Sequence, residues 1–362
     1  MAKADDEAVV LEIAGHEVRI SRPDKVYFPA SGETKLDLVN YYVAVAEPLM
    51  ATMGGRPTLL QRFPEGATGQ SFFQKRVPKN APTWLQTDWV STPNGTPSNA
   101  MVAADVAHIA WAVNIGCLGF HVWPSYAGER ADVEPDPRSP ALGYGLSALE
   151  RGPIADELRI DLDPGPGVTF EMVREGAAEV KRLFDDLGVR AYTKTTGNRG
   201  IHIYVRVEDG RWTSYDVRAC AVAVARELER RRPDLMTAAW WKEDRGARVF
   251  IDFNQNAPHK TVFGAWSARS RAGGQVSGPF GWDELPGIHP DELTLQTVPA
   301  RYAAAGDPWA DMYATPNPLD PMLALHERDM ADGLQDAPWP PVYPKMPNEP
   351  PRVSASRAKK DS

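Results

Sequence analysis

The run Ile160-Asp161-Leu162-Asp163-Pro164-Gly165 lies near the middle of the chain and places two carboxylates at the end of an apolar stretch. The β-prone residues before Asp161 predict a strand, and Pro164-Gly165 predicts that this strand stops sharply. Because side chains alternate across a strand, Asp161 and Asp163 emerge on one face, with Leu162 packed behind them. The run Phe250-Ile251-Asp252-Phe253 also reads as a strand. Pairing of the two strands would bring three carboxylates together.

Three neighbouring carboxylates predict a metal site. Like charges at this separation stay ionised only when cations neutralise them, and Mg²⁺ or Mn²⁺ prefer oxygen ligands. Two such ions about 3.5 to 4 Å apart can hold the attacking and leaving oxygens of an in-line phosphoryl displacement. An Asp-x-Asp pair is more often a turn or capping feature. Here both carboxylates end a strand, which favours Asp161, Asp163 and Asp252 as ligands of two metal ions.

The run Thr196-Gly197-Asn198-Arg199-Gly200-Ile201-His202 forms a glycine-bounded turn between two alternating apolar segments. Such a turn can present backbone N–H groups to an anion, and Arg199 adds positive charge. His202, on the outgoing strand, could donate to a phosphate oxygen. Most Gly-x-x-Gly hairpins are only hairpins, so the turn alone is a weak signal. Together with the carboxylates it indicates a site for nucleotidyl transfer.

Composition bounds the class of protein. With 362 residues, 43% of them apolar, the chain can bury a large core in one sizeable domain or two lobes. No apolar run approaches the roughly 18 residues of a membrane span, and residues 1–7 lack the apolar core of a signal peptide, so we expect a cytoplasmic protein. Cys117 and Cys220 lack metal-ligand spacing and are expected to be buried thiols. The net charge of −8 argues against non-specific coating of nucleic acid.

The expected elements intermix strands and helices, which favours an α+β fold over a doubly wound parallel sheet. Besides the strands of Asp161 and Asp252, we expect strands at 9–13, 18–20, 58–63, 70–77, 117–122, 190–195 and 201–207, and helices at 35–53, 104–116, 169–187 and 214–232. Phe72 and Phe73 are adjacent, so one ring should enter the core while the other is exposed and able to stack on a nucleobase. The alternative interpretation, that both rings lie in a hydrophobic edge, is nearly as well supported. Residues 123–158 are rich in Pro, Gly and charge, which predicts a long excursion or a disordered stretch between two strands.

Taken together, these motifs resemble the polymerase domain of bacterial DNA ligase D, a branch of the archaeo-eukaryotic primase superfamily. The resemblance extends from about Val18 to about Trp339 and rests on Asp-Leu-Asp-Pro-Gly, the Thr-Gly-x-Arg-Gly-x-His turn, and Val-Phe-Ile-Asp-Phe followed by Asn254-Gln255-Asn256. It implies a primase-like catalytic core with an RNA-recognition-motif-like antiparallel sheet and a flanking N-terminal α/β portion. The remaining length fits no ligase or phosphoesterase module, so we expect a stand-alone member.

The resemblance also divides the chain. We expect a flexible N-terminus at 1–8, a primase-polymerase domain at 9–340 and a disordered tail at 341–362. Within the domain, the expected parts are an N-terminal portion at about 9–122, a catalytic core at about 159–300 and a C-terminal wrap at about 301–340.

Individual site residues follow from the same resemblance. Asp161, Asp163 and Asp252 would bind two Mn²⁺ or Mg²⁺ ions. For the nucleotide, the resemblance implies triphosphate binding by Thr196, Arg199 and His202, a contact by His121, and completion of the pocket by Gln255 and Arg269. For the DNA, it implies binding of a 5′-phosphate by Lys25 and Lys35, support of the template by Phe72 or Phe73, and contact with the primer by Lys242 and Arg245. Thr196 and Arg199 replace the usual Ser and Lys while keeping the hydroxyl and the charge.

The activity that the resemblance implies is DNA-templated nucleotidyl transfer, which fills short gaps or extends ends in DNA repair with a preference for NTPs over dNTPs. The implied partners are gapped or primer-template DNA with a 5′-phosphate, and end-joining or excision-repair proteins at the nucleoid; no membrane partner is expected. Two alternatives remain open. A metal-dependent phosphoesterase or nuclease would use the same carboxylates with water as the attacking group. A non-catalytic module would bind 5′-phosphorylated DNA ends without turnover.

Overall fold

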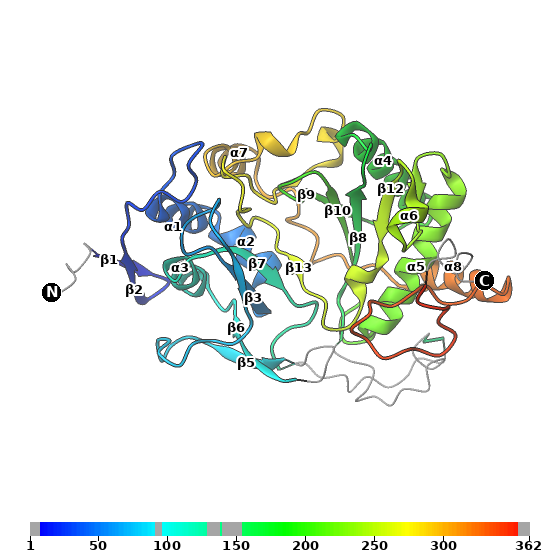
Figure 1. Ribbon diagram of the computed structural model, residues 1–362, viewed down its shortest axis with the longest axis horizontal. Helices are drawn as coiled ribbons and strands as arrows, with labels where there is room; N and C mark the ends of the chain where they lie inside the picture. Colours follow the sequence, from blue (N-terminus) through cyan, green and yellow to red (C-terminus); the bar gives the residue numbers. More distant parts are fainter. Residues whose placement is uncertain (1–7, 91–95, 129–137, 140–153, 354–362) are drawn as a thin grey trace.

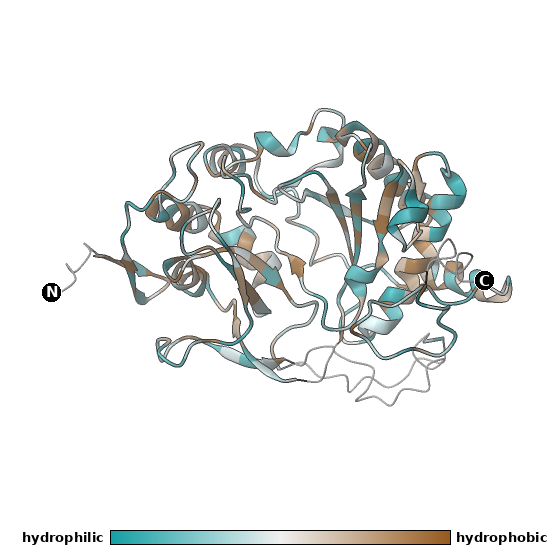
Figure 2. Cartoon of the chain, viewed as in Figure 1, coloured by the Kyte–Doolittle hydropathy of each residue, from teal (hydrophilic) through white to brown (hydrophobic). Residues whose placement is uncertain are grey.

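Two antiparallel-rich sheets organise the protein. The computed structural model describes residues 8–90, 96–128, 138–139 and 154–353 (Figure 1). One sheet belongs to the N-terminal half, and the other belongs to the catalytic half; each has six strands. The apolar residues lie mainly along the strands and on the helix faces turned toward them, while the outer helix faces are hydrophilic (Figure 2). This arrangement confirms the expected α+β fold.

The N-terminal half begins with a hairpin of β1 (Ala8–Ile13) and β2 (His16–Ser21). Its sheet has the order β13-β7-β3-β6-β5, with β4 paired to β3. The strands are β3 (Pro57–Arg62), β4 (Phe72–Gln74), β5 (Thr87–Val90), β6 (Ser98–Val102), β7 (Cys117–Val122) and β13 (Val262–Phe263), and the helices are α1 (Lys35–Ala44), α2 (Ala46–Met53) and α3 (Val106–Asn114).

The catalytic half is built on a sheet of order β11-β12-β8-β10-β9-β14. Its strands are β8 (Glu157–Pro164), β9 (Tyr192–Thr195), β10 (Ile201–Arg206), β11 (Met236–Thr237), β12 (Val249–Asp252) and β14 (Pro279–Phe280). Its helices are α4 (Phe170–Asp186), α5 (Ser214–Arg231), α6 (Lys242–Arg245) and α8 (Asp320–Ala331), while α7 (Thr297–Ala305) reaches the N-terminal half, where the Tyr302 hydroxyl donates to Glu47 of α2 (Figure 1). Helices α4 and α5 pack against β8 on one face of the sheet, which leaves the opposite face for the carboxylates (Figure 1).

Strand pairing and buried ion pairs connect the two halves of the protein. After β12 the chain leaves the catalytic sheet, pairs as β13 with β7, and returns as β14 beside β9. Buried Arg56 donates 2.6 and 3.0 Å hydrogen bonds to the carboxylate of Asp156 and contacts Glu157 at 3.2 Å. Because these groups are buried, the ion pairs hold the halves in a fixed relation.

Local signals in the sequence explain several element ends. Thr169 caps α4 by accepting from the N–H of Met172, and Gly188 follows that helix with a φ of +66°. Cys117 and Cys220 are buried free thiols, as expected. Among the described helices, none has the length and apolar character needed to cross a membrane.

Three expectations were wrong. The helix expected at 35–53 is two helices broken at Val45, because Pro48 has no N–H to donate to the carbonyl of Ala44 and its ring would clash there. Both Phe72 and Phe73 are exposed, by 47% and 55%, since β4 is a short edge strand.

The third wrong expectation is the disordered tail from residue 341, because the chain packs against the rest of the protein at least as far as Met346. Tyr343 and Met346 are buried in a cluster with Trp339 and Tyr215. Residues 354–362 lie outside the described residues, as does most of the excursion expected at 123–158.

Candidate active site

The three carboxylates meet on adjacent strands of the catalytic sheet. β8 pairs antiparallel with β12, and this register places Asp252 directly opposite Asp161. Asp163 lies two residues further along β8, on the same face. One acceptor oxygen from each side chain lies within 4.8 Å of the others. Asp161 and Asp163 thus share a face, as strand alternation predicts, and the pairing of β8 with β12 brings Asp252 to them.

Burial disfavours the charged forms of all three carboxylates, and repulsion between carboxylates adds to this at Asp163 and Asp252. Burial raises the pKa of Asp161 to about 6. Burial, followed by the charge of Asp161, raises the pKa of Asp163 to about 7 and that of Asp252 to about 7. The Gln255 amide donates to Asp161 at 3.3 Å and to Asp252 at 3.0 Å, so it holds two of the carboxylates together. Such oxygen-only clusters fit hard divalent cations.

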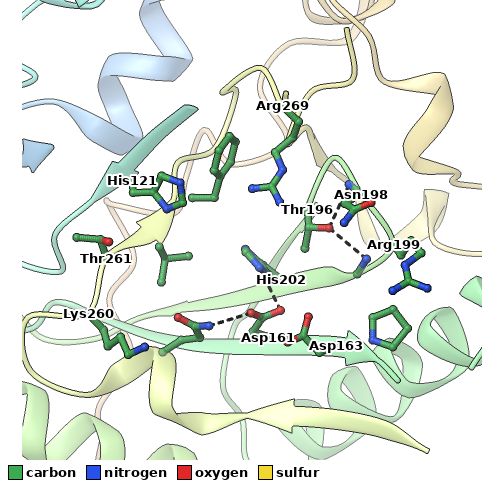
Figure 3. Close-up of a pocket in the computed structure, with 15 residues that line it drawn as sticks. His121, Asp161, Asp163, Thr196, Asn198, Arg199, His202, Lys260, Thr261 and Arg269 are labelled. Carbon is green, nitrogen blue, oxygen red and sulfur yellow. Dashed lines mark hydrogen bonds and ion pairs between the residues drawn. The ribbon is translucent and has the colours of Figure 1, made fainter. Parts of the chain in front are cut away.

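The turn from Thr196 to Gly200 lies beside this cluster and is tightly packed. The Thr196 hydroxyl accepts from the N–H groups of Asn198 and Gly200 at 3.2 and 3.1 Å (Figure 3). Gly197 has a φ of +66°, and a Cβ there would lie 2.4 Å from Arg269. A Cβ on Gly200 would lie 2.7 Å from the backbone oxygen of Leu162. Both glycines are therefore required for the turn to approach the carboxylates.

His202 and His121 are both held neutral. His202 lies opposite Asp161 in the sheet register, with Nε2 3.1 Å from a carboxylate oxygen. Burial, and then the charges of Lys194 and Arg269, lower its pKa well below the usual value. Burial, and then Arg269, lower the pKa of His121 to about 3. A neutral imidazole keeps one N–H to donate and one nitrogen to accept.

A cavity of about 370 Å³ connects these groups. The sequence-predicted residues that line it are His121, Asp161, Asp163, Thr196, Arg199, His202, Gln255 and Arg269. Asp252 adjoins it through Gln255. The wall of residues 260–263 and Asn198 were not predicted. The wall residues arrive through the β13–β7 pairing, which no local motif signals, whereas Asn198 was visible inside the glycine turn.

Lys242 and Arg245 line a second cavity, of about 470 Å³, which shares Asp163 and Arg199 with the first. The Arg245 guanidinium lies 3.4 Å from the centre of the Phe250 ring and donates to the carbonyls of Ala239 and Trp240. A basic surface thus adjoins the carboxylates at the end of β8.

The remaining predicted residues lie in the N-terminal half. The Lys25 ammonium donates to the Pro64 carbonyl at 2.7 Å and to Glu65 at 2.9 Å. Lys35 is 2% exposed, and its ammonium donates to the carbonyls of Ser21 and Asn114. The structure does not bring these lysines to the carboxylates. Phe73 lies closer, with its ring centre 5.4 Å from that of His121.

The fold and the site define a class of enzyme, the primase-polymerases, in which an acidic cluster on an antiparallel sheet serves nucleotidyl transfer. More particularly, the family model for the LigD primase-polymerase domain matches residues 34–309, and the chain belongs to this family of nucleotidyltransferases. The polymerase domain of Mycobacterium tuberculosis ligase D, solved in complex with DNA, superposes with a TM-score of 0.71. That match has 30% sequence identity and covers 82% of this chain and 98% of the other.

Curated relatives agree with this assignment. The multifunctional non-homologous end joining protein LigD of Mycolicibacterium smegmatis is 32% identical over 332 residues, which is 91% of this chain and 40% of that protein. The bifunctional LigD of Bacillus subtilis is 29% identical over 84% of this chain and 45% of its own length. The chain thus spans less than half the length of these two relatives.

Proposed function

We propose that this protein is a DNA-templated polymerase that fills short gaps or extends ends during DNA repair, with a preference for NTPs. The observation that carries the proposal is the cluster of Asp161, Asp163 and Asp252, whose oxygens lie within 4.8 Å of one another. It adjoins a glycine turn with the form of a phosphate-binding loop. Membership of the LigD primase-polymerase family makes phosphoryl transfer to a primer the best-supported chemistry for this cluster.

Asp161, Asp163 and Asp252 are suited to hold two Mn²⁺ or Mg²⁺ ions. Burial raises the pKa of each of these carboxyl groups, and divalent cations bound there would favour the charged forms again. When bound, such ions lower the pKa of an attacking hydroxyl and stabilise the negative charge of a leaving pyrophosphate. Gln255, which donates to two of the carboxylates, sets their orientation.

The incoming triphosphate would lie on the side of the site formed by β9 and β10. Thr196 orders the turn there, while Arg199 and Arg269 supply positive charge. Neutral His202 and His121 can donate to phosphate or sugar oxygens without adding charge. This assignment leaves Lys242 and Arg245 for the primer strand upstream of its 3′ end, in the second cavity, which shares Asp163 and Arg199 with the first.

We propose DNA as the partner along the N-terminal half. The exposed rings of Phe72 and Phe73 are available to stack on template bases, for which every base offers a π face. Lys25 and Lys35 remain our candidates for a 5′-phosphate, which would require both ammonium groups to leave their present carbonyl partners. End-joining or excision-repair proteins at the nucleoid are the proposed context.

We also propose the division of the chain that the sequence implies, with an N-terminal portion at about 9–122, a catalytic core at about 159–300 and a wrap at about 301–340. The strands of the two sheets support this division in outline, since β13 is the single described strand that leaves its own half.

The decisive experiment is extension of a labelled primer on a gapped duplex with a 5′-phosphate, comparing NTPs with dNTPs in Mn²⁺ and in Mg²⁺. Template-directed lengthening, faster with NTPs and abolished by Asp161→Ala, is the expected result. Shortening of the primer would instead indicate a nuclease. Binding that depends on the 5′-phosphate, without any lengthening, would indicate an end-binding module.

A further inference from the structure

Lys260 and Thr261 are polar residues of the catalytic cavity for which the proposed mechanism has no use. Both side chains line the cavity together with the carboxylates. Throughout residues 8–353, as far as these are described, neither side chain makes a hydrogen bond or ion pair. In Figure 3, Lys260 extends along the floor of the cavity toward Asp161, from the side opposite Arg199. Polar groups directed into a functional cavity without internal partners are free to bind a ligand.

The cations of the site fall into two groups, on opposite sides of the carboxylates. Arg199 and Arg269 lie with the glycine turn, near β9 and β10. Lys260 lies on the other side, near β12, where its charge opposes the upward shift of the Asp252 pKa. Arg245 lies between the two groups, since it lines the second cavity together with Arg199 and Asp163 and also interacts electrostatically with Asp252. Asp252, on β12, therefore has Lys260 as a neighbouring cation that does not belong to the glycine turn.

In-line displacement assigns these two groups to different ligands. The attacking and leaving oxygens lie on opposite sides of the phosphorus in such a reaction. If the leaving pyrophosphate lies against Arg199 and Arg269, the primer 3′-oxygen must approach from the side of Asp252 and Lys260. This step rests on the proposed function. It places the end of the primer strand, with its last phosphodiester, beside an unpartnered ammonium group.

We propose that Lys260 binds the phosphodiester nearest the 3′ end of the primer, with the Thr261 hydroxyl as a second donor. An ammonium is a compact charge that suits a single phosphate, and a hydroxyl adds a short directional hydrogen bond. The contact would fix the terminal nucleotide so that its 3′-oxygen points at the reacting phosphorus. Lys260 is thus a positioning residue for the primer, distinct from the arginines that hold the triphosphate.

The test is a double-mutant cycle between the protein and the DNA. Single-nucleotide addition is measured with Lys260 or Lys260→Met, on primers whose last phosphodiester is either normal or a neutral methylphosphonate. For the wild-type protein, the methylphosphonate should lower kcat/KM for the primer about tenfold, the size typical of losing a hydrogen bond to a charged group. With Lys260→Met, kcat/KM for the normal primer should already be about tenfold below that of the wild-type protein. The methylphosphonate should lower the kcat/KM of this variant by less than a further twofold.

Controls separate this contact from general effects. Lys260→Arg keeps the charge and should keep the methylphosphonate penalty, while Lys345→Met, at an exposed lysine that does not line the cavity, should behave as wild type. A methylphosphonate several linkages upstream should affect the wild-type protein and Lys260→Met equally. The proposal would be overturned if Lys260→Met and the methylphosphonate at the last linkage each lowered kcat/KM independently, so that their effects multiplied. It would also be overturned if Lys260→Met changed only the KM for the NTP. Failure of the wild-type protein to extend any primer would instead refute the proposed function.

Discussion

Replacing Gly200 with alanine tests the geometry of the glycine turn, residues 196–200. A Cβ at this position would lie 2.7 Å from the backbone oxygen of Leu162, and ordinary contact begins at 3.4 Å, so the turn or β8 must move by about 0.7 Å. Leu162 lies between two of the carboxylates, so neither element can move without disturbing the site. Displacements of about 1 Å cost on the order of 100-fold in rate. We therefore expect kcat/KM for the NTP to fall between about 10- and 100-fold.

The assay is primer extension at varied NTP, with the thermal midpoint measured in parallel. A matched control is Gly287→Ala, because a Cβ there meets nothing within 4 Å. We expect the control to keep wild-type kinetics, and Gly200→Ala to raise the KM for the NTP while remaining folded. If Gly200→Ala retained kcat/KM within threefold of wild type, the close approach of the turn to the carboxylates would not matter for catalysis.

Three further predictions concern charge, packing and DNA. The pKa of Asp252 is raised from 3.8 to about 7, so the folded state binds this proton more tightly than the unfolded state, and the free energy of unfolding falls as pH rises between those values. Without metal, Asp252→Asn should therefore have a higher thermal midpoint than wild type at pH 8. Equal midpoints at that pH would contradict this prediction. Arg56→Met removes one of two arginine partners from each of the buried carboxylates Asp156 and Glu157, which keep Arg206 and Arg159, and should lower the free energy of unfolding by about 1.5 to 3 kcal/mol in urea titrations. Phe73→Ala should weaken template binding about tenfold, the loss of one stacked base, while its 55% exposure predicts an unchanged midpoint; unchanged affinity would remove Phe73 from the template surface.

The centre of the site could be predicted from the sequence because its geometry is local. Strand alternation alone places Asp161 and Asp163 on one face, and glycine spacing alone marks the turn at Gly197 and Gly200. The apolar residues before Asp252 predict its strand but not the neighbour of that strand, so the convergence of three carboxylates depended on a pairing that the sequence alone does not supply. The register confirms that pairing.

What the sequence did not reveal depends on contacts between distant parts of the chain. Lys260 enters the site because Val262 pairs with Val122, a contact with no sequence signature. Tyr343 is buried only because Trp339 and Tyr215 offer it a surface. The break at Val45, in contrast, had a local signal in Pro48 that helical periodicity outweighed.

The course of the chain between Asp252 and Phe280 links two binding events mechanically. Within this one segment the chain supplies a carboxylate of the acidic cluster, a wall of the adjoining cavity, Arg269 and the edge strand β14. A force that separates the two halves would pull this segment from both ends at once. Affinity for divalent cations and affinity for nucleotides should therefore be lost at the same denaturant concentration, below that at which α4 and α5 unfold.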